Sequence, residues 1–196
     1  GYTYSYDMLG EAARTEADAL RYLDAYAKAI SAIAGAAKSK DIRDNPGISV
    51  KLSALYARYE EGQSEAVMQV LVPRLLQLCE QAAAAGIGLN IDAEEADRLS
   101  LSLDVIGAAF ASPTLAGWDG FGVVVQAYGL RAAETIDWLY AMAKAHDRRI
   151  MVRLVKGAYW DTEIKRAQVM GLEGFPVFTS KPHSDVSYIA NARKLL

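Results

Sequence analysis

The sequence has 196 residues, of which 52% are hydrophobic and 23% are charged, a balance that is typical of a folded globular protein and excludes a disordered or fibrous chain. The formal net charge of -3 arises from interspersed acids and bases, so we expect no nucleic-acid binding through this segment. Cys79 is the only cysteine, which excludes an internal disulfide and indicates a reducing compartment, where we expect this thiol to be buried and inert.

Segments of strand character alternate with helical patterns along the chain. In chain order we expect a strand over 5–9, a helical region over 11–39, a strand over 47–55, a helix over 65–86, a strand over 88–95, a helix over 95–111, a strand over 121–128, a helix over 131–147, a strand over 149–159, and helices over 160–171 and 184–196. In the first helical region, apolar residues recur at spacings of three and four, at Leu20, Leu23, Ala27, Ile30 and Ile33. We expect Gly86 to end the second helix and Ser184 to begin the last one.

The two ends of the sequence resemble internal positions of a longer polypeptide. "GYTYSYD" has neither an initiator Met nor a basic and apolar leader, and "IANARKLL" ends in a helical pattern without Gly or Pro. Apolar stretches are interrupted well before the roughly 20 residues that a membrane span needs, so we expect no transmembrane helix.

The alternation of strands with helices favours parallel βαβ units, because two parallel strands need a crossover of a dozen or more residues between them. No repeat, low-complexity tract or composition shift divides the chain. We therefore expect a single α/β domain over residues 1–196.

Polar residues follow one parity of every expected strand toward its carboxyl end, while the other parity is apolar. These polar residues are Asp7, Lys51, Asp92, Gln126 and Arg153. In a (βα)8 barrel this parity faces the mouth where ligands bind. Any one of these residues alone is more often a solvated rim residue or half of a structural ion pair. Five strands with the same parity favour a common site.

A doubly wound open sheet is the alternative architecture, since it also gathers polar groups at strand ends. It usually carries a glycine-rich fingerprint after the first strand, and "DMLGEAAR" has neither that fingerprint nor a Walker lysine. The pattern therefore favours the barrel.

Several kinds of chemistry are poorly supported. His146 and His183 are the only histidines, far apart and expected at the surface, so no metal site is predicted. Ser49 and Ser53 lack a nearby histidine and a G-x-S-x-G elbow. The acids of "EEAD" over 94–97 stand where a helix begins, a position that acids favour for structural reasons.

Fixed cations and hydrogen-bonding groups remain, and they suit an anionic substrate or a phosphate-bearing cofactor. Arg153 cannot lose its charge, and Gly157, in "KGAY", would let a phosphate or ring approach the backbone. Three interpretations stay open at this point: a flavin oxidoreductase, a Schiff-base lyase that uses Lys51 or Lys156, and a non-catalytic interaction scaffold. The scaffold leaves the inward charges unexplained.

Six segments carry a family resemblance, namely "YSYDMLGEAA", "GISVKLSAL", "NIDAEEADRL", "VVQAY", "RLVKGAYWDTEIKRAQ" and "GLEGFPVFTSK". From Tyr4 to Leu196 the chain resembles the proline dehydrogenase domain of the bifunctional proline utilization A flavoenzymes. The resemblance implies a distorted (βα)8 barrel that holds FAD non-covalently, oxidises L-proline to pyrroline-5-carboxylate and passes electrons to a membrane quinone. It also implies a cytoplasmic protein that associates peripherally with the inner face of the membrane when active.

The resemblance further implies roles for individual residues. Arg153 would lie beside the flavin N5 and stabilise the reduced flavin, and Gln126 would hydrogen-bond the isoalloxazine ring with Val124 beside it. Lys51 would pair with the substrate carboxylate. Further residues would line the flavin, the proline or both: Asp92 and Ala93 between the two, Val155, Lys156, Gly157, Ala158, Tyr159 and Trp160 along the FAD, Tyr159 also against the proline ring, and Thr179 and Lys181 toward the adenosine. Arg153, Lys51 and Asp92 are the expected catalytic residues.

The chain offers five strands, whereas a barrel of this kind needs eight and usually about 250 residues. In the family, later strands add FAD contacts, and the last helix adds two arginines that clamp the proline carboxylate. We therefore expect that the rest of the barrel is required, for instance as another chain, and that the segment alone is sticky or unstable without it. An inactive piece that needs the rest of the barrel is the alternative. An open five-stranded sheet would expose an unpaired edge and an apolar face.

Overall fold

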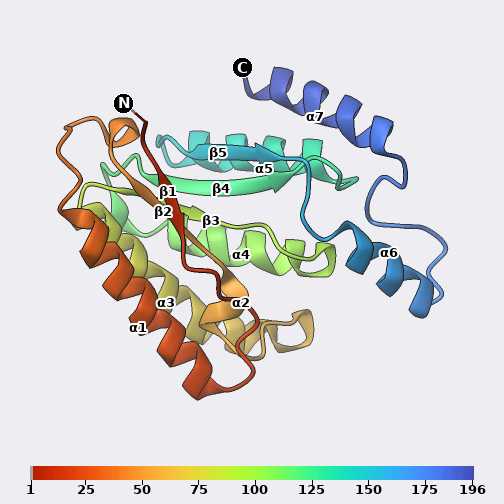
Figure 1. Ribbon diagram of the computed structural model, residues 1–196, viewed down its shortest axis with the longest axis horizontal. Coiled ribbons are helices and arrows are strands. Elements are labelled where there is room, and N and C mark those ends of the chain that lie inside the picture. The colour runs from red at the N-terminus through yellow and green to blue at the C-terminus, as the bar shows by residue number, and fades with distance from the viewer. Residues whose placement is uncertain (1) are drawn as a thin grey trace.

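Five parallel strands form the centre of the structure, a computed structural model that describes residues 2–196 (Figure 1). The strands are β1 (Ser5–Asp7), β2 (Gly47–Val50), β3 (Gly88–Ile91), β4 (Phe121–Gln126) and β5 (Met151–Val155). They lie side by side in sequence order, and every neighbouring pair is parallel. Doubly wound sheets reverse their strand order at a switch point, whereas barrels add each strand beside the last. The expected barrel-type βαβ succession is therefore confirmed.

Helices connect the strands and cover one side of the sheet. They are α1 (Glu16–Ala34), the short α2 (Leu52–Leu55), α3 (Ser64–Ala84), α4 (Leu99–Phe110), α5 (Ala132–Ala145), α6 (Trp160–Val169) and α7 (Lys181–Leu195). α1 packs on α3, α3 on α4, and α5 on α7. α6 lies beyond the arrowheads of β4 and β5, at the edge where parallel strands end (Figure 1).

Local signals explain the start of α1 and the end of α3. A capping box starts α1, since the Thr15 hydroxyl accepts from the Asp18 backbone N–H and the Asp18 carboxylate accepts from Thr15. Gly86 follows α3 with φ of 67°, the left-handed conformation that ends many helices, as expected.

Three expectations about local structure are wrong. The strand expected over 47–55 ends at Val50, because Leu52–Leu55 form the helical turn α2, which buries both leucines in the core. Ser184 does not begin the last helix but is buried inside α7, which starts after Ser180 with Pro182 in its first turn, where a missing N–H costs nothing. Leu20 is 50% exposed and does not join the core stripe of α1.

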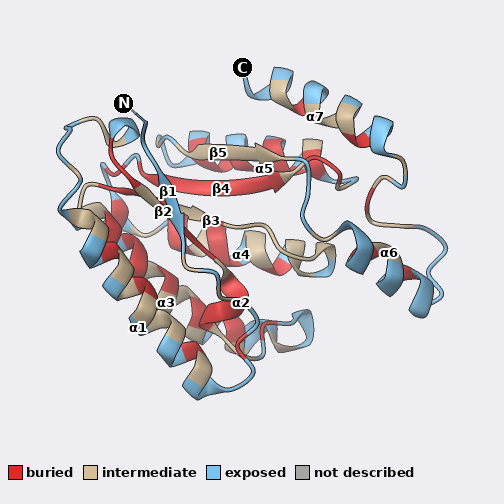
Figure 2. Cartoon of the chain, in the orientation of Figure 1, coloured by how far each residue is buried: buried red, intermediate tan, exposed pale blue. Residues whose placement is uncertain are grey.

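The core lies between the sheet and its helices (Figure 2). The apolar parity of the strands supplies one wall, with exposed fractions of 3% or less at Ile48, Val50, Leu89, Ile91 and Val123. The opposite face carries glycines and polar residues together with Val124, Met151 and Val155; a side chain at Gly122, for example, would clash with Asn90. The period-two pattern of the sequence therefore separates a dry helical face from a polar inner face.

Within residues 2–196 the sheet is open, because β1 and β5 each pair with a single neighbour. All three residues of β1 are exposed, and Tyr6 retains 47% of its accessible surface. The expected unpaired edge is confirmed.

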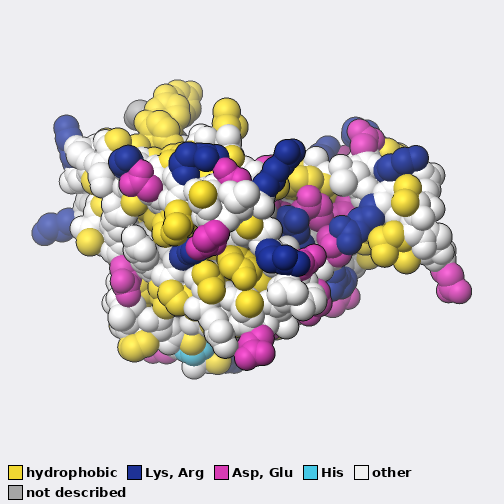
Figure 3. Space-filling view, turned by 90° about the horizontal axis from the view of Figure 1, so that it is seen from below, with side chains coloured by type: hydrophobic (Ala, Val, Ile, Leu, Met, Phe, Trp, Pro, Cys, Tyr) yellow, Lys and Arg dark blue, Asp and Glu magenta, His cyan; other side chains and the backbone are white. Residues whose placement is uncertain are grey.

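Several surface expectations can also be checked. Cys79 is free and buried, and His146 and His183 are both exposed, as predicted. Charges of both signs are mixed on the face seen from below (Figure 3). No helix among residues 2–196 combines the length and the apolar character that crossing a membrane requires.

Candidate functional site

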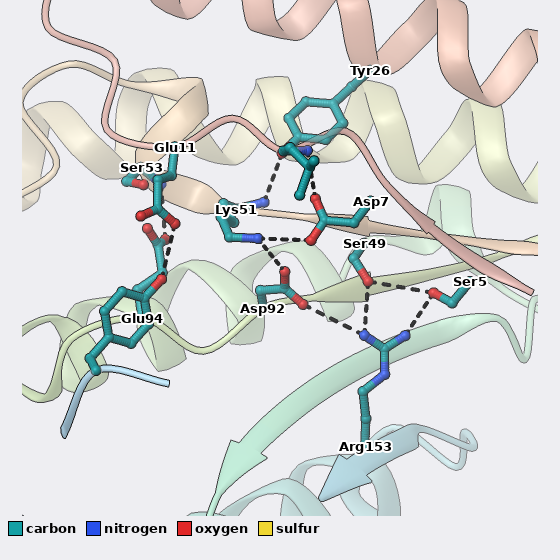
Figure 4. A network of polar contacts seen from close by, with 12 residues as sticks. Ser5, Asp7, Glu11, Tyr26, Ser49, Lys51, Ser53, Asp92, Glu94 and Arg153 are labelled. Carbon is teal, nitrogen blue, oxygen red and sulfur yellow. Dashed lines mark hydrogen bonds and ion pairs between the residues drawn. The ribbon is translucent and has the colours of Figure 1, made fainter. Parts of the chain in front are cut away.

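Four charged side chains of alternating sign meet on the inner face of the sheet (Figure 4). Lys51, directly after β2, places its Nζ 3.1 Å from Asp7 Oδ2 and 2.8 Å from Asp92 Oδ2. Arg153 of β5 reaches toward the same carboxylate, with its guanidinium 3.7 Å from Asp92 Oδ1. Asp7 ends β1 and Asp92 follows β3, so four different strands bring this network together. The predicted gathering is confirmed for these four residues, whereas Gln126 makes its hydrogen bonds outside the network. The catalytic roles of Arg153, Lys51 and Asp92 stay predictions.

The network fixes the protonation of its lysine. Burial by itself would lower the pKa of Lys51, but the hydrogen bonds and negative charges of Asp92 and Asp7 outweigh it and hold that pKa above its ordinary value. The pKa of Asp7 is lowered: desolvation opposes the shift, and the Leu9 backbone N–H and the Lys51 ammonium more than compensate. Lys51 is therefore protonated near neutral pH, and the formal charges of the four groups in the network sum to zero.

Arg153 extends across the inner face. Its Nη1 donates to Ser49 Oγ at 2.9 Å, and its Nη2 donates to Ser5 Oγ at 2.7 Å. Val124 lies beside it on β4, since the two residues are paired in the sheet register. The side chain of Arg153 keeps 35% of its surface exposed, so the guanidinium is both held in place and open to a ligand.

Gln126, the last residue of β4, bridges two loops. Its Nε2 donates to the Glu94 carbonyl at 2.9 Å, and its Oε1 accepts from the Ala158 N–H at 2.8 Å. Val155 is its register partner on β5. The amide therefore ties the loop after β3, which carries Ala93, to the segment after β5.

The segment from Lys156 to Trp160 has an unusual backbone. Gly157 has φ of 145°, which side-chain-bearing residues rarely adopt, and a side chain there would clash with the Tyr128 ring. The Tyr159 hydroxyl donates to Glu11 Oε2 at 3.0 Å, and the Trp160 indole donates to the Phe178 carbonyl at 2.9 Å. Gly157 and Ala158 are exposed, so their backbone is accessible to a ligand.

The remaining predicted cofactor residues form a second, basic cluster. Lys156 and Lys181 share the Asp185 carboxylate, with N–O distances of 2.5 and 2.6 Å. One carboxylate between two ammonium groups leaves a net positive charge, which suits a phosphate. Thr179 is exposed beside this cluster in sequence.

The structure shows two residues at the site that the sequence did not indicate, Glu11 and Tyr26. Glu11 holds the Tyr159 hydroxyl, and burial together with the Glu11 and Glu94 charges raises the pKa of Tyr159, which keeps the phenol protonated. Tyr26 accepts from the Lys51 backbone N–H at 3.2 Å. Serines and tyrosines carry no charge pattern, so only the fold reveals their contacts. Glu11 was a visible acid close to Asp7, but nothing in its spacing indicated a partner 148 residues away.

The acids of "EEAD" are used structurally, as expected. Glu94 Oε1 accepts from the Ser53 N–H at 3.0 Å, and Arg98 lies 3.2 Å from Glu95. In the described part of the chain, no three His, Cys, Asp or Glu side chains are grouped so that they could hold a metal ion.

Schiff-base chemistry fits this geometry poorly. A lysine nucleophile must be neutral, which requires a lowered pKa. The pKa of Lys51 is raised by its two carboxylates, and the pKa of Lys156 is raised by its hydrogen bond to Asp185. Both amines therefore stay protonated near neutral pH.

Comparison with known proteins gives a consistent result. The family model for proline dehydrogenase matches residues 1–196. The bifunctional protein PutA of Salmonella typhimurium is 56% identical over the whole chain, which spans 15% of that protein. A crystal structure of Bradyrhizobium japonicum proline utilization A superposes with a TM-score of 0.97 at 60% identity, covering 99% of this chain and 20% of the other. A PutA structure described with proline bound in remote sites matches with a TM-score of 0.96, also at 60% identity, over 98% of this chain and 20% of that one.

Proposed function

Because the chain belongs to the proline dehydrogenase family, we propose that it contributes the FAD and proline sites of a flavoenzyme that oxidises L-proline to pyrroline-5-carboxylate. The fold is the parallel α/β sheet of the TIM-barrel-type proline dehydrogenase domain, of which this chain forms a part. The observation that carries the proposal is the inner-face network of Lys51, Asp92 and Arg153. Such a network gives cations at fixed positions and a hydrogen-bonding rim at the mouth where barrels bind ligands.

The donor set fits FAD. A flavin presents hydrogen-bonding edges, becomes more negative on reduction and carries a pyrophosphate. Arg153 offers a permanent cation on the inner face, and Lys156 with Lys181 offers the net positive charge that a pyrophosphate needs. The exposed backbone at Gly157 lets a flat ring or phosphate approach closely. Trp160 and Tyr159 provide aromatic surface next to it.

The substrate end of the site is the Lys51 ammonium. An ammonium has three N–H donors, and Asp7 and Asp92 take two of them. The third is available for one oxygen of the proline carboxylate. Tyr159, held by Glu11, would then pack against the proline ring. Asp92 and Ala93 would lie between substrate and cofactor.

Electrostatics then favours the reaction. When bound, FAD accepts the two electrons that proline loses. The guanidinium of Arg153 is already held by Ser5 and Ser49 and needs no rearrangement to stabilise the negative charge that develops. Gln126 keeps the two loops that flank the ring in register.

We place electron transfer to a membrane quinone, and a cytoplasmic protein that docks peripherally on the membrane, within the same proposal. They follow from the family likeness and not from a feature of this sheet. The open edges of β1 and β5 support the further proposal that the other strands of the barrel must join this segment for activity.

The visible absorption spectrum of the full-length protein tests the proposal. We expect a flavin spectrum that bleaches when L-proline is added under anaerobic conditions, while D-proline serves as the control. A colourless protein, or a yellow one that L-proline does not bleach, would overturn it. For the lyase alternative, borohydride with a keto acid should leave Lys51 and Lys156 unmodified in a mass spectrum.

A further inference from the structure

Glu163 is a buried acid that the site described above does not use. It lies in the first turn of α6, and only 3% of the residue is exposed. Its Oε1 accepts a hydrogen bond of 2.6 Å from the backbone N–H of Ala96. The contact joins residues 67 positions apart, so it is a tertiary contact and not a helix cap.

The contact links the two segments that flank the proposed flavin site. Ala96 stands on the loop after β3, four residues beyond Asp92. Glu163 follows Tyr159 by four residues, and its own N–H donates to the Tyr159 carbonyl at 2.9 Å. Gln126 already bridges the same two segments nearer the sheet. Glu163 therefore forms a second bridge, farther from the sheet, on the helix that carries Tyr159 and Trp160.

The surroundings of Glu163 disfavour its negative charge. Burial raises the pKa of Glu163, and the charges of Asp97 and Glu95 raise it further. Arg166 lies on the same helix, but it pairs with Asp97 at 2.5 Å. A carboxylate buried beside two others destabilises the fold unless hydrogen bonds or cations compensate it, and the Ala96 N–H supplies the hydrogen bond here.

We propose that Glu163 is a positioning residue, which holds α6 against the loop after β3 and so fixes Tyr159 and the Gly157–Ala158 backbone relative to Asp92. The inference rests on the proposed function, because it assigns Glu163 to the flavin and proline site of that function. The alternative is a structural staple whose loss lowers stability without changing ligand binding.

Three substitutions distinguish the hydrogen bond between Glu163 and Ala96 from the negative charge of Glu163. Glu163→Gln keeps the acceptor oxygen and removes the charge, and it also removes repulsion from Asp97 and Glu95. Glu163→Asp keeps the charge, but its side chain is one methylene too short to reach Ala96. Glu163→Ala removes both. The matched control is Glu173→Asp, at an exposed position of the loop after α6.

The measurements use the full-length protein and do not depend on activity alone. We expect Glu163→Asp and Glu163→Ala to raise the KM for proline and the dissociation constant of FAD from the apoprotein by up to about tenfold, the factor expected for the loss of one hydrogen bond. The kcat should change less. Glu163→Gln and Glu173→Asp should stay within about twofold of wild type, the spread expected when no contact is lost.

Each outcome bears on a different statement. If Glu163→Asp keeps the wild-type KM and FAD affinity while Glu163→Gln loses them, the charge of Glu163 matters and its contact with Ala96 does not, and the inference is wrong. It is equally wrong if Glu163→Asp loses thermal stability while both KM and FAD affinity are unchanged. If Glu163→Ala does not fold, the comparison of Glu163→Asp with Glu163→Gln still tests whether the contact with Ala96 positions the site. A wild-type protein that L-proline does not bleach would overturn the proposed function instead.

Discussion

Replacing Lys51 by Met should weaken proline binding strongly. Lys51 Nζ is the cation of the inner face most removed from water, because its side chain is 15% exposed, compared with 35% for Arg153. It is also the group with a free N–H donor left after Asp7 and Asp92 are satisfied. Met keeps most of the volume of the side chain and removes the charge together with the N–H donors.

The size of the effect follows from the geometry. A hydrogen bond between charged groups contributes about 1.5–3 kcal/mol, which is roughly 10- to 150-fold in a dissociation constant. The variant also leaves Asp7 and Asp92 facing each other without a cation between them, so the network changes from neutral to a charge of −1. A substrate carboxylate entering that network would meet repulsion in addition to the lost bond.

Anaerobic flavin reduction at varied proline concentration measures this directly, since its saturation gives the dissociation constant and its plateau gives the rate. We expect the dissociation constant to rise and FAD content to stay unchanged. Lys28→Met is the matched control, because Lys28 is 76% exposed and pairs only with Asp24 one turn away. An unchanged dissociation constant in Lys51→Met would refute the assignment of Lys51 to the substrate carboxylate.

Three further predictions concern other parts of the site. Arg153→Met should slow flavin reduction by about 10²- to 10³-fold, as measured by stopped-flow absorbance, whereas Arg149→Met, at a side chain that is 84% exposed, should not. Gly157→Ala should destabilise the folded state by about 1–3 kcal/mol, lower the melting temperature and weaken FAD binding, because Gly157 has φ of 145° and a side chain there would clash with the Tyr128 ring. Gly35→Ala, with open space around it, should leave the melting temperature unchanged. Since the pKa of Asp7 is lowered from 3.8, its contribution to stability is present above that value and is lost as the pH falls through the folded pKa. Asp7→Asn should therefore lower the melting temperature at pH 7 and lose that effect in strong acid, and an equal effect at both pH values would contradict the assignment.

The sheet could be predicted from the sequence because its signal is periodic. One parity of the strands is apolar and the other becomes polar toward the carboxyl end, and this pattern identified the inner face on which Lys51, Asp92 and Arg153 meet. The carboxyl ends of the strands were harder to place. The expected strand over 47–55 continued through Leu52 and Leu55 because both a strand and a buried helical turn can hold such apolar residues.

Contacts between distant loops could not be predicted in the same way. The bond of Tyr159 to Glu11 depends on how two loops lie in space, and neither residue is part of a pattern. Glu163 is a stronger case, since an acid in the first turn of a helix is favourable at any surface helix. Only its burial and its bond to Ala96 distinguish it.

The reach of Arg153 shows why fold and site cannot be separated in this chain. β1 and β5 are the two edges of the sheet, four strand intervals apart, which in a flat sheet would be roughly 19 Å. Yet one arginine side chain from β5 donates to Ser5 of β1 at 2.7 Å. That bond is possible only if the sheet curls so that its edges approach each other, as strands do in a barrel. The same curvature brings Asp7 of β1 and Asp92 after β3 to either side of Lys51. A mutation that flattened the sheet would therefore separate the side chains of the network even if every charged residue remained.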